Sequence, residues 1–352
     1  MKPIVRKVLQ SSLARSLTTP LSVDHYLGLI DSKLSINEPR GRIADVQRQT
    51  PDSVTLTIAP NDNWITPRPG QHILFGIDLD GVRHRRCFSI ASAARDDRVE
   101  ITVKRNGDGV VSNFLVDHAK AGQLVYLSHP EGDFYPNVEP PAKALLLSAG
   151  SGITPVMSIL RSWIDDDRLP DVVFMHYAST DEDMIYTDEL EALAKEHDAL
   201  TLIIRYTQEH GRIDGDTLDR EVPELGERMT WLCGPSGFMD AAESLLDART
   251  TKPIFREQFE SSRREAAQGE GEVHFIKSDV AASGDEGSLL EVAENAGLNP
   301  PYGCRMGICH SCKCRVSEGT VRDLRSNEVR EIRDTDIQIC IHAAAGDVAL
   351  EI

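Results

Sequence analysis

The fold is decided by a cysteine-rich stretch near the C-terminus, Pro300-Pro301-Tyr302-Gly303-Cys304-Arg305-Met306-Gly307-Ile308-Cys309-His310-Ser311-Cys312-Lys313-Cys314. Within it, Cys304, Cys309 and Cys312 have the spacing C-x4-C-x2-C, and Cys340 follows at a distance. This is the plant-type spacing of a [2Fe-2S] cluster, in which one tight loop supplies three thiolates and a remote cysteine supplies the fourth. The sequence therefore predicts an iron–sulfur cluster held by these four cysteines.

Zinc and disulfides are the other uses that cysteines commonly have. Structural zinc sites usually pair two short cysteine knuckles, and the second knuckle is missing here. Disulfide frameworks suit small secreted domains, and nothing in the sequence signals export. Gly303 and Gly307 permit the positive φ angles that a tight cluster loop needs. Cys314 is expected to begin a strand and to point away from the iron, so it is excluded as a ligand.

Length and charge narrow the class of protein. A chain of 352 residues is expected to form two to three domains. The net charge of −18 argues against nucleic acid or an anionic membrane surface as the main partner, and it suits a docking partner with a basic face. Seven cysteines, four of them assigned to iron, indicate a reducing cytoplasm. No run of about 18 apolar residues is present, so no membrane span is expected, although peripheral docking remains open.

Residues 1–39 are predicted to form an N-terminal helical extension. It carries basic residues without a continuous apolar run, so it is not expected to be a secretory signal. Asn37-Glu38-Pro39 is expected to end its helix. Two interpretations remain: a helix packed on the next domain, which is favoured because apolar stripes usually mark cores, or a docking element for a partner. The stripe recurs at helical spacing and consists of Val23, Tyr26, Leu27, Ile30 and Leu34.

Residues 40–138 are predicted to form a small antiparallel β-barrel. Short runs of alternating apolar residues are separated by turn-forming residues such as Pro67-Arg68-Pro69-Gly70 and Asp78–Gly81. Several short strands with such turns are typical of a barrel. The predicted strands are Ser53–Ile58, His72–Ile77, Cys87–Ala91, Val99–Lys104 and Leu124–Ser128.

Residues 139–262 are predicted to form an α/β domain. Strands alternate with helices, which implies a parallel sheet covered on both faces. The predicted strands are Ala144–Ser148, Val172–Tyr177, Thr201–Tyr206 and Thr230–Cys233. The predicted helices are Thr154–Trp163, Tyr186–Glu196 and Gly237–Asp247.

Residues 263–271 are polar and lack periodicity, so they are predicted to be a linker. The cysteine loop belongs to the last region, residues 272–352. A strand at Glu272–Ser278, a helix at Ser288–Ala296 and a final strand at Asp347–Ile352 surround the loop. Short strands around one helix indicate a β-grasp fold.

Two turns of the α/β region could bind a nucleotide. The first holds Gly150, Ser151, Gly152, Ile153, Thr154 and Pro155. Its glycines allow close backbone approach, and the following helix offers free N–H groups and a positive dipole to a pyrophosphate. The third glycine of G-x-G-x-x-G is replaced by Pro155, so a tight turn that binds nothing is also possible. The second turn, Cys233-Gly234-Pro235, ends another strand, where parallel sheets bind ligands. Cys233 would face that crevice, unless it is an inert buried cysteine.

Two motifs of the barrel region complete the pattern: Arg86-Cys87-Phe88-Ser89 and Gly109-Val110-Val111-Ser112-Asn113. Together with the glycine turns and the cysteine spacing, they occur in a fixed order over the chain beyond residue 40. In the order of these motifs, the chain resembles the ferredoxin–NADP reductase superfamily. Its domain order is similar to that of the oxygenase reductases, with a flavin barrel, a nicotinamide domain and a plant-type ferredoxin.

The resemblance implies how a flavin would be held. The family motif R-x-Y-[ST] maps to Arg86, Phe88 and Ser89, with phenylalanine in place of tyrosine. Phe88 would lie against the isoalloxazine, Arg86 would neutralise the flavin phosphates and Ser89 would bond near the ring. The pyrophosphate-holding segment, which favours FAD over FMN, is matched by Lys104, Gly109, Val111 and Ser112.

The same resemblance implies a nicotinamide site. The two glycine turns match the family motifs G-x-G-x-[ST]-P and C-G-P, the latter formed by Cys233, Gly234 and Pro235. The hydride would cross the crevice between the barrel and the α/β domain, with Thr154 and Cys233 flanking it as catalytic residues.

The choice between NADPH and NADH depends on the segment after the strand Val172–Tyr177. Ser179 and Thr180 could meet the adenosine ribose or its 2′-phosphate. Arg205 and Arg212 are candidate cations for a phosphate, whereas Asp181 and Glu182 oppose one. NADPH is slightly favoured.

The order of the parts indicates an electron-transfer enzyme. A nicotinamide gives two electrons as a hydride, a [2Fe-2S] cluster accepts one, and flavin can do both. Electrons would pass from NAD(P)H to FAD, to the cluster and to a protein acceptor, either an oxygenase component or a membrane desaturase. The segment Tyr26-Leu27-Gly28-Leu29-Ile30 is similar to reductase partners of bacterial membrane fatty-acid desaturases. The alternatives are the reductase of a soluble Rieske-type oxygenase and a redox-sensing iron–sulfur flavoprotein.

Overall fold

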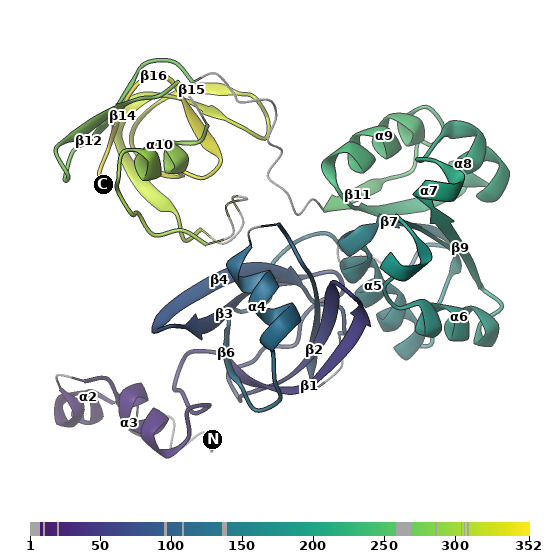
Figure 1. Cartoon of the computed structure of the whole chain (residues 1–352), viewed down its shortest axis with the longest axis horizontal. Helices are drawn as coiled ribbons and strands as arrows, with labels where there is room; N and C mark the ends of the chain where they lie inside the picture. Colours follow the sequence, from purple (N-terminus) through teal and green to yellow (C-terminus); the bar gives the residue numbers. More distant parts are fainter. Residues whose placement is uncertain are drawn as a thin grey trace. The chain divides into compact units, whose positions relative to one another are not determined.

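The chain folds into two units, Met1–Gln258 and Phe259–Ile352. The structure is a computed structural model, and it describes residues 8–9, 11–19, 21–94, 97–107, 109–135, 139–257, 269–285, 287–303, 305, 307 and 310–352. Figure 1 shows the elements of each unit. No helix within these ranges is long and apolar enough to cross a bilayer.

Six antiparallel strands form the predicted barrel in the first unit (Figure 1). Their order is β4-β3-β6-β1-β2-β5, and a bridge between Ile90 and Ile101 brings the two edges of the sheet together. Helix α4 contributes Leu115 to the apolar core. The elements are β1 (Arg40–Thr50), β2 (Ser53–Pro60), β3 (His72–Leu79), β4 (Val82–Ser89), β5 (Val99–Lys104), α4 (Val110–His118) and β6 (Leu124–Leu127).

The N-terminal extension differs from its prediction. It contains α2 (Ser12–Thr18) and α3 (Val23–Ile30), and α3 ends seven residues before the expected stop, with Asp31 as its C-cap. Val23 is buried, but Tyr26 is 42% exposed and Ile30 is 79% exposed. Leu27 and Leu34 are half-buried, so the predicted apolar stripe is covered only in part.

The α/β domain has a five-stranded parallel sheet with the order β11-β10-β7-β8-β9. Its strands are β7 (Lys143–Ala149), β8 (Asp171–Ala178), β9 (Leu200–Tyr206), β10 (Met229–Cys233) and β11 (Ile254–Glu257). Its helices are α5 (Ile153–Asp165), α6 (Thr187–Glu196), α7 (Thr207–His210), α8 (Gly215–Glu221) and α9 (Ser236–Asp247), with short 3-10 turns at Gly150–Gly152, Asp181–Asp183 and Leu225–Glu227. The strand order reverses beside β7, because the chain continues to β8 on one side and returns to β10 on the other.

The second unit is a β-grasp domain. Its five strands have the order β13-β12-β16-β14-β15, with β12 parallel to β16 and the other pairs antiparallel. Glu270 already bridges to Ala345 of this sheet, so the last residues of the predicted linker pack on the domain. The elements are β12 (Glu272–Phe275), β13 (Val280–Ser283), α10 (Leu289–Asn295), β14 (Lys313–Asp323), β15 (Val329–Gln338) and β16 (His342–Leu350).

Candidate active site

The two glycine turns meet where the strand order reverses. A Cβ on Gly152 would lie 2.7 Å from the backbone nitrogen of Gly234, and closer still to the carbonyl of Cys233. The turns therefore touch through their backbones, and only glycine fits at this position. Gly150 has a φ of +53°, and an added Cβ there would meet no atom within 4 Å. This open, glycine-lined turn at the switch point of a parallel sheet fits a nucleotide phosphate.

Thr154 supports the first turn. Its Oγ1 donates a hydrogen bond to the carbonyl of Ser151 at 3.0 Å, and the residue is only 3% exposed. Ile153, Thr154 and Pro155 begin α5, whose first N–H groups have no partner inside the helix. Pro235 likewise precedes the first residue of α9. Two helix N-termini thus flank the site, whereas the contact of Thr154 with nicotinamide stays a prediction.

A partly buried carboxylate, Glu257, joins the barrel to the α/β domain beside Cys233. Strands β10 and β11 pair with Cys233 opposite Glu257. At the end of β4, Ser89 Oγ donates to Glu257 Oε2 at 3.4 Å, and Nδ1 of His72 lies 3.2 Å from Oε1. The predicted flavin residue Ser89 and the predicted catalytic residue Cys233 therefore come together at one carboxylate.

The thiol of Cys233 is fully buried. Burial raises its pKa well above the usual range, and the nearby charge of Glu257 raises it further. The thiol is therefore protonated at neutral pH. This burial agrees with the alternative of an inert buried cysteine, and a role of Cys233 in hydride transfer stays a prediction.

Glu257 and His72 were not predicted from the sequence. Glu257 ends β11, a strand that was not predicted either, and 185 residues separate it from His72. The position of Glu257 could have identified it, because a carboxylate at the carboxyl end of a parallel strand lies where such sheets bind ligands.

Two predicted flavin residues of β4, Arg86 and Phe88, make contacts that are compatible with a bound flavin. Phe88 is half-buried and packs edge-on against Phe75, with ring centroids 5.7 Å apart. Arg86 donates to the carbonyl of Arg85 at 2.7 Å and forms no ion pair with any described residue. A guanidinium without a carboxylate partner fits a phosphate group.

The second predicted flavin segment is the N-terminus of α4. Gly109 is its N-cap, and Ser112 Oγ donates to the Gly109 carbonyl at 3.2 Å. The side chain of Val111 is fully buried in the barrel core, so only its backbone can reach a phosphate. Nζ of Lys104 lies 3.4 Å from carboxylate oxygens of both Asp52 and Asp183. A pyrophosphate would have to compete with these carboxylates for the lysine.

The segment after β8 agrees only in part with the predicted site for the adenosine ribose. Thr180 Oγ1 donates to Asp183 at 2.9 Å, and the Ser179 carbonyl accepts a hydrogen bond from the backbone of Gln208. Arg205 donates to Glu221 at 2.9 Å, so the expectation that it is a free cation is corrected. Arg212 is exposed and forms no ion pair within the part of the chain that the structure describes.

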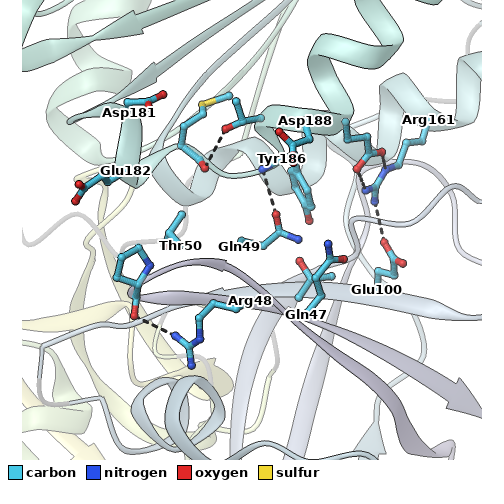
Figure 2. Close-up of a pocket in the computed structure, with 15 residues that line it drawn as sticks. Gln47, Arg48, Gln49, Thr50, Glu100, Arg161, Asp181, Glu182, Tyr186 and Asp188 are labelled. Atoms are coloured by element: carbon cyan, nitrogen blue, oxygen red, sulfur yellow. Dashed lines mark hydrogen bonds and ion pairs between the residues drawn. The ribbon is translucent and has the colours of Figure 1, made fainter.

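A separate cavity of about 830 Å³ opens between the barrel and α6 (Figure 2). Arg161 ties its two sides together, because it donates to Glu189 at 2.6 and 2.7 Å and to Glu100 at 3.0 Å. Tyr186 bonds through its hydroxyl to Thr102 of the barrel. None of the residues predicted to bind flavin or nucleotide lines this cavity, so neither group is assigned to it.

The cysteine site is partly described. The sulfur atoms of Cys312 and Cys340 lie 3.0 Å apart, and both residues are buried. Two thiols this close can bind the same iron. The other two predicted ligands, Cys304 and Cys309, lie outside the described residues.

The loop before Cys312 packs tightly on the segment around Cys340. Gly307 has a φ of +72°, and a Cβ there would lie 2.6 Å from the side chain of Ile341. Gln338 also donates to the Gly307 carbonyl at 2.6 Å. Cys314, within β14, has its sulfur 3.6 Å from the Arg315 carbonyl, which agrees with its exclusion as a ligand. These features fit a compact cluster.

Three domain families match the chain in the predicted order. They are described as an oxidoreductase FAD-binding domain over residues 46–135, an oxidoreductase NAD-binding domain over residues 146–244 and a 2Fe-2S iron-sulfur cluster binding domain over residues 276–344. The cofactors are therefore FAD, NAD(P)H and a [2Fe-2S] cluster. Fold and site together define an NAD(P)H-dependent flavin and iron–sulfur oxidoreductase.

Relatives over nearly the whole chain agree. The chain is 40% identical over 348 residues to an NADPH oxidoreductase of Mycobacterium tuberculosis, covering 97% of this chain and 91% of the relative. It is 31% identical over 327 residues to the ferredoxin reductase component of 3-ketosteroid-9-alpha-monooxygenase of the same species, covering 84% and 89%. The structure of phthalate dioxygenase reductase has the same fold, with a TM-score of 0.60 at 22% identity over 89% of this chain and 97% of that one. The chain belongs to the ferredoxin–NADP reductase superfamily, as an oxygenase reductase with a C-terminal 2Fe-2S domain.

The bound flavin supplies the conversion of a hydride into single electrons. The glycine turns would admit the nucleotide phosphates at the sheet edge, and the Ser89–Glu257 contact holds the barrel against that edge.

Proposed function

We propose that the chain passes electrons from NADPH, through FAD and the cluster, to a protein that activates oxygen. The observation that carries the proposal is the contact of Ser89 with Glu257, because it brings the flavin and nucleotide domains together at one edge of a sheet in a chain that also carries a cluster site. Relatives named as reductase components serve monooxygenases, including a glycine betaine monooxygenase of Pseudomonas aeruginosa at 29% identity.

Two acceptors are proposed. An oxygenase component is supported by the names of these relatives. A membrane fatty-acid desaturase is supported by the resemblance of the segment Tyr26-Leu27-Gly28-Leu29-Ile30. Cysteines committed to a cluster suit a reducing compartment, so we place the protein in the cytoplasm.

NADPH is supported by Arg212, an exposed cation shortly after β9 without an ion-pair partner among the described residues. The neighbouring end of β8 carries Ser179, whose carbonyl bonds to Gln208 in α7. Arg212 therefore follows the turn that contacts the predicted ribose segment. The family also contains an NADH oxidoreductase of Escherichia coli, 30% identical over 322 residues, so the preference has to be measured.

Steady-state reduction of cytochrome c with each nucleotide tests the proposal. We expect a higher kcat/KM for NADPH. Arg212→Ala should raise the KM for NADPH about tenfold and leave that for NADH unchanged, because one charge-assisted bond is worth about 1.5–3 kcal/mol. Arg220→Ala is the matched control, since that exposed arginine pairs with Glu221. Equal use of both nucleotides would contradict the NADPH assignment, and absence of turnover would favour the redox-sensing alternative.

A pull-down with the full chain, performed separately on membrane and soluble fractions, tests the acceptor. Recovery of a desaturase from the membrane fraction, or of an oxygenase component from the soluble fraction, would decide between the two. Transfer of electrons to the recovered protein on addition of NADPH is the required confirmation.

A further inference from the structure

Exposed apolar side chains are concentrated in the N-terminal extension. Of the twelve large apolar side chains that are strongly exposed among the described residues, six lie between residues 8 and 30. Single exposed apolar residues are ordinary, whereas a concentration of them marks an interaction site. The six are Val8 (61%), Leu17 (78%), Leu21 (45%), Tyr26 (42%), Leu29 (74%) and Ile30 (79%).

The extension that contains these residues also begins with a charge opposite to that of the rest of the chain. Its first 23 residues contain Lys2, Arg6, Lys7 and Arg15 and no aspartate or glutamate. The chain as a whole has a net charge of −18, so the remainder carries −22. The overall charge, which argued against an anionic membrane, therefore does not describe this end of the molecule.

The two acidic residues nearest to this segment accept hydrogen bonds, Asp24 from within the extension and Asp31 from the barrel. Asp24 accepts hydrogen bonds from Ser35 Oγ at 2.9 Å and from the backbone of Ile36 at 2.6 Å. Asp31 accepts from Arg42 of β1 at 3.0 Å, and the pKa of that carboxyl is lowered first by the backbone N–H of Lys33 and then by the Arg42 hydrogen bond. The positive charge of Arg42 is paired with Asp31, whereas Asp24 keeps its negative charge because both of its donors are neutral.

The extension is also fixed to the barrel. Asn61 donates to the carbonyls of Lys33 and Glu38 at 3.1 Å, and Asn63 donates to the carbonyl of Ser35 at 2.9 Å. A surface bound by α3 would therefore hold the barrel at a defined position. The exposed side of α3 is not needed for this attachment.

We propose that the N-terminal extension docks the protein on an anionic lipid bilayer. Leu17, Leu21, Leu29 and Ile30 enter the interface, and the basic residues of the sequence add an attraction to the anionic lipid. Exposed apolar residues combined with lysine and arginine are the composition of helices that lie in a membrane interface. Basic residues add an attraction to anionic lipid that falls off within a Debye length. The inference does not depend on which protein accepts the electrons.

Sedimentation of the full chain with vesicles tests the proposal. We expect binding to vesicles of phosphatidylcholine with phosphatidylglycerol, weakened about tenfold without phosphatidylglycerol and weakened again by salt. Leu29→Ser with Ile30→Ser should reduce binding about tenfold, as should Arg6→Glu with Lys7→Glu. The matched control is Ile65→Ser with Val82→Ser, which alters two exposed apolar residues elsewhere on the first unit, at 56% and 57%.

All variants should retain NADPH–ferricyanide activity, which shows that they are folded. Absence of vesicle binding, or binding that neither variant pair weakens, would overturn the proposal. So would a result in which Leu29→Ser with Ile30→Ser impairs electron transfer to the acceptor protein in the absence of vesicles, because the surface would then be a protein interface.

Discussion

Ser89 ends a strand of the barrel, Glu257 ends a strand of the α/β domain, and Ser89 Oγ donates to the Glu257 carboxylate at 3.4 Å although 168 residues separate them. The contact places the predicted flavin residue Ser89 at the carboxyl end of a strand of the parallel sheet. His72 shares the same carboxylate from a second barrel strand, so the contact joins the domains through two side chains.

Glu257→Ala should lower the free energy of unfolding by about 1–3 kcal/mol, because two buried polar groups lose their partner. Glu257→Gln retains acceptor and donor atoms at the same position and should recover most of the loss. The control is Glu243→Ala, whose ion pair with Arg256 is exposed and should contribute less than about 1 kcal/mol. Urea denaturation measures all three, and equal losses for Glu257→Ala and Glu243→Ala would refute the link.

Gly152→Ala should damage both folding and nucleotide binding, because the new Cβ would clash with the backbone of Gly234. Overpacking of this kind costs about 1–3 kcal/mol. Gly237→Ala introduces the same methyl group nearby within α9, where no atom lies within 4 Å, and should be neutral or stabilising. Thermal unfolding and NADPH titration distinguish the two, and a neutral Gly152→Ala would show that the turns do not touch.

His176 should make the α/β domain sensitive to acid. Burial lowers its pKa from 6.5 to about 3, and Nδ1 bonds to Ser148 Oγ at 2.8 Å. Because the pKa is depressed in the folded state, the contribution of His176 to stability is present above pH 6.5 and is lost as the pH falls toward 3. His176→Asn, which cannot titrate, should flatten the acid limb of urea midpoints followed by tryptophan fluorescence. The exposed His129→Asn is the control, and an unchanged acid limb in His176→Asn would refute the assignment.

Cys340→Ser should lose the cluster, whereas Cys314→Ser should keep two irons per chain. Cys340→Ser removes a sulfur that lies 3.0 Å from the sulfur of Cys312. Cys314→Ser removes a sulfur that is hydrogen-bonded to the neighbouring carbonyl of Arg315. Iron and acid-labile sulfide analysis, with visible spectra, provides the measurement. The reverse pattern would place the fourth ligand within the loop, and zinc without sulfide would disprove the cluster.

Most of the architecture could be predicted because its signals are local. The strands Val99–Lys104 and Lys143–Ala149 are runs of apolar or alternating residues with clear ends. Strand β1 was not predicted, since Arg42, Asp45 and Arg48 interrupt its apolar pattern. In the extension, apolar periodicity predicted burial, but periodicity alone cannot show whether a partner surface exists within the chain.

The candidate site was predictable only where a motif is contiguous. The glycine turns, the cysteine spacing and the Arg86–Ser89 motif could be recognised in this way. Glu257 could not, because its role depends on strand pairing and on contacts with residues far away in the sequence. The ion pair of Arg205 with Glu221 was missed for the same reason.

The central claim is that electrons leave through the cluster and not directly from the flavin. Stopped-flow and steady-state measurements on Cys312→Ala, with Cys314→Ala as the control, test it most directly. We expect NADPH to bleach the flavin of Cys312→Ala at the wild-type rate and ferricyanide reduction to persist, while reduction of cytochrome c collapses in Cys312→Ala alone. Cytochrome c reduction at the wild-type rate in a Cys312→Ala protein without cluster would contradict the account.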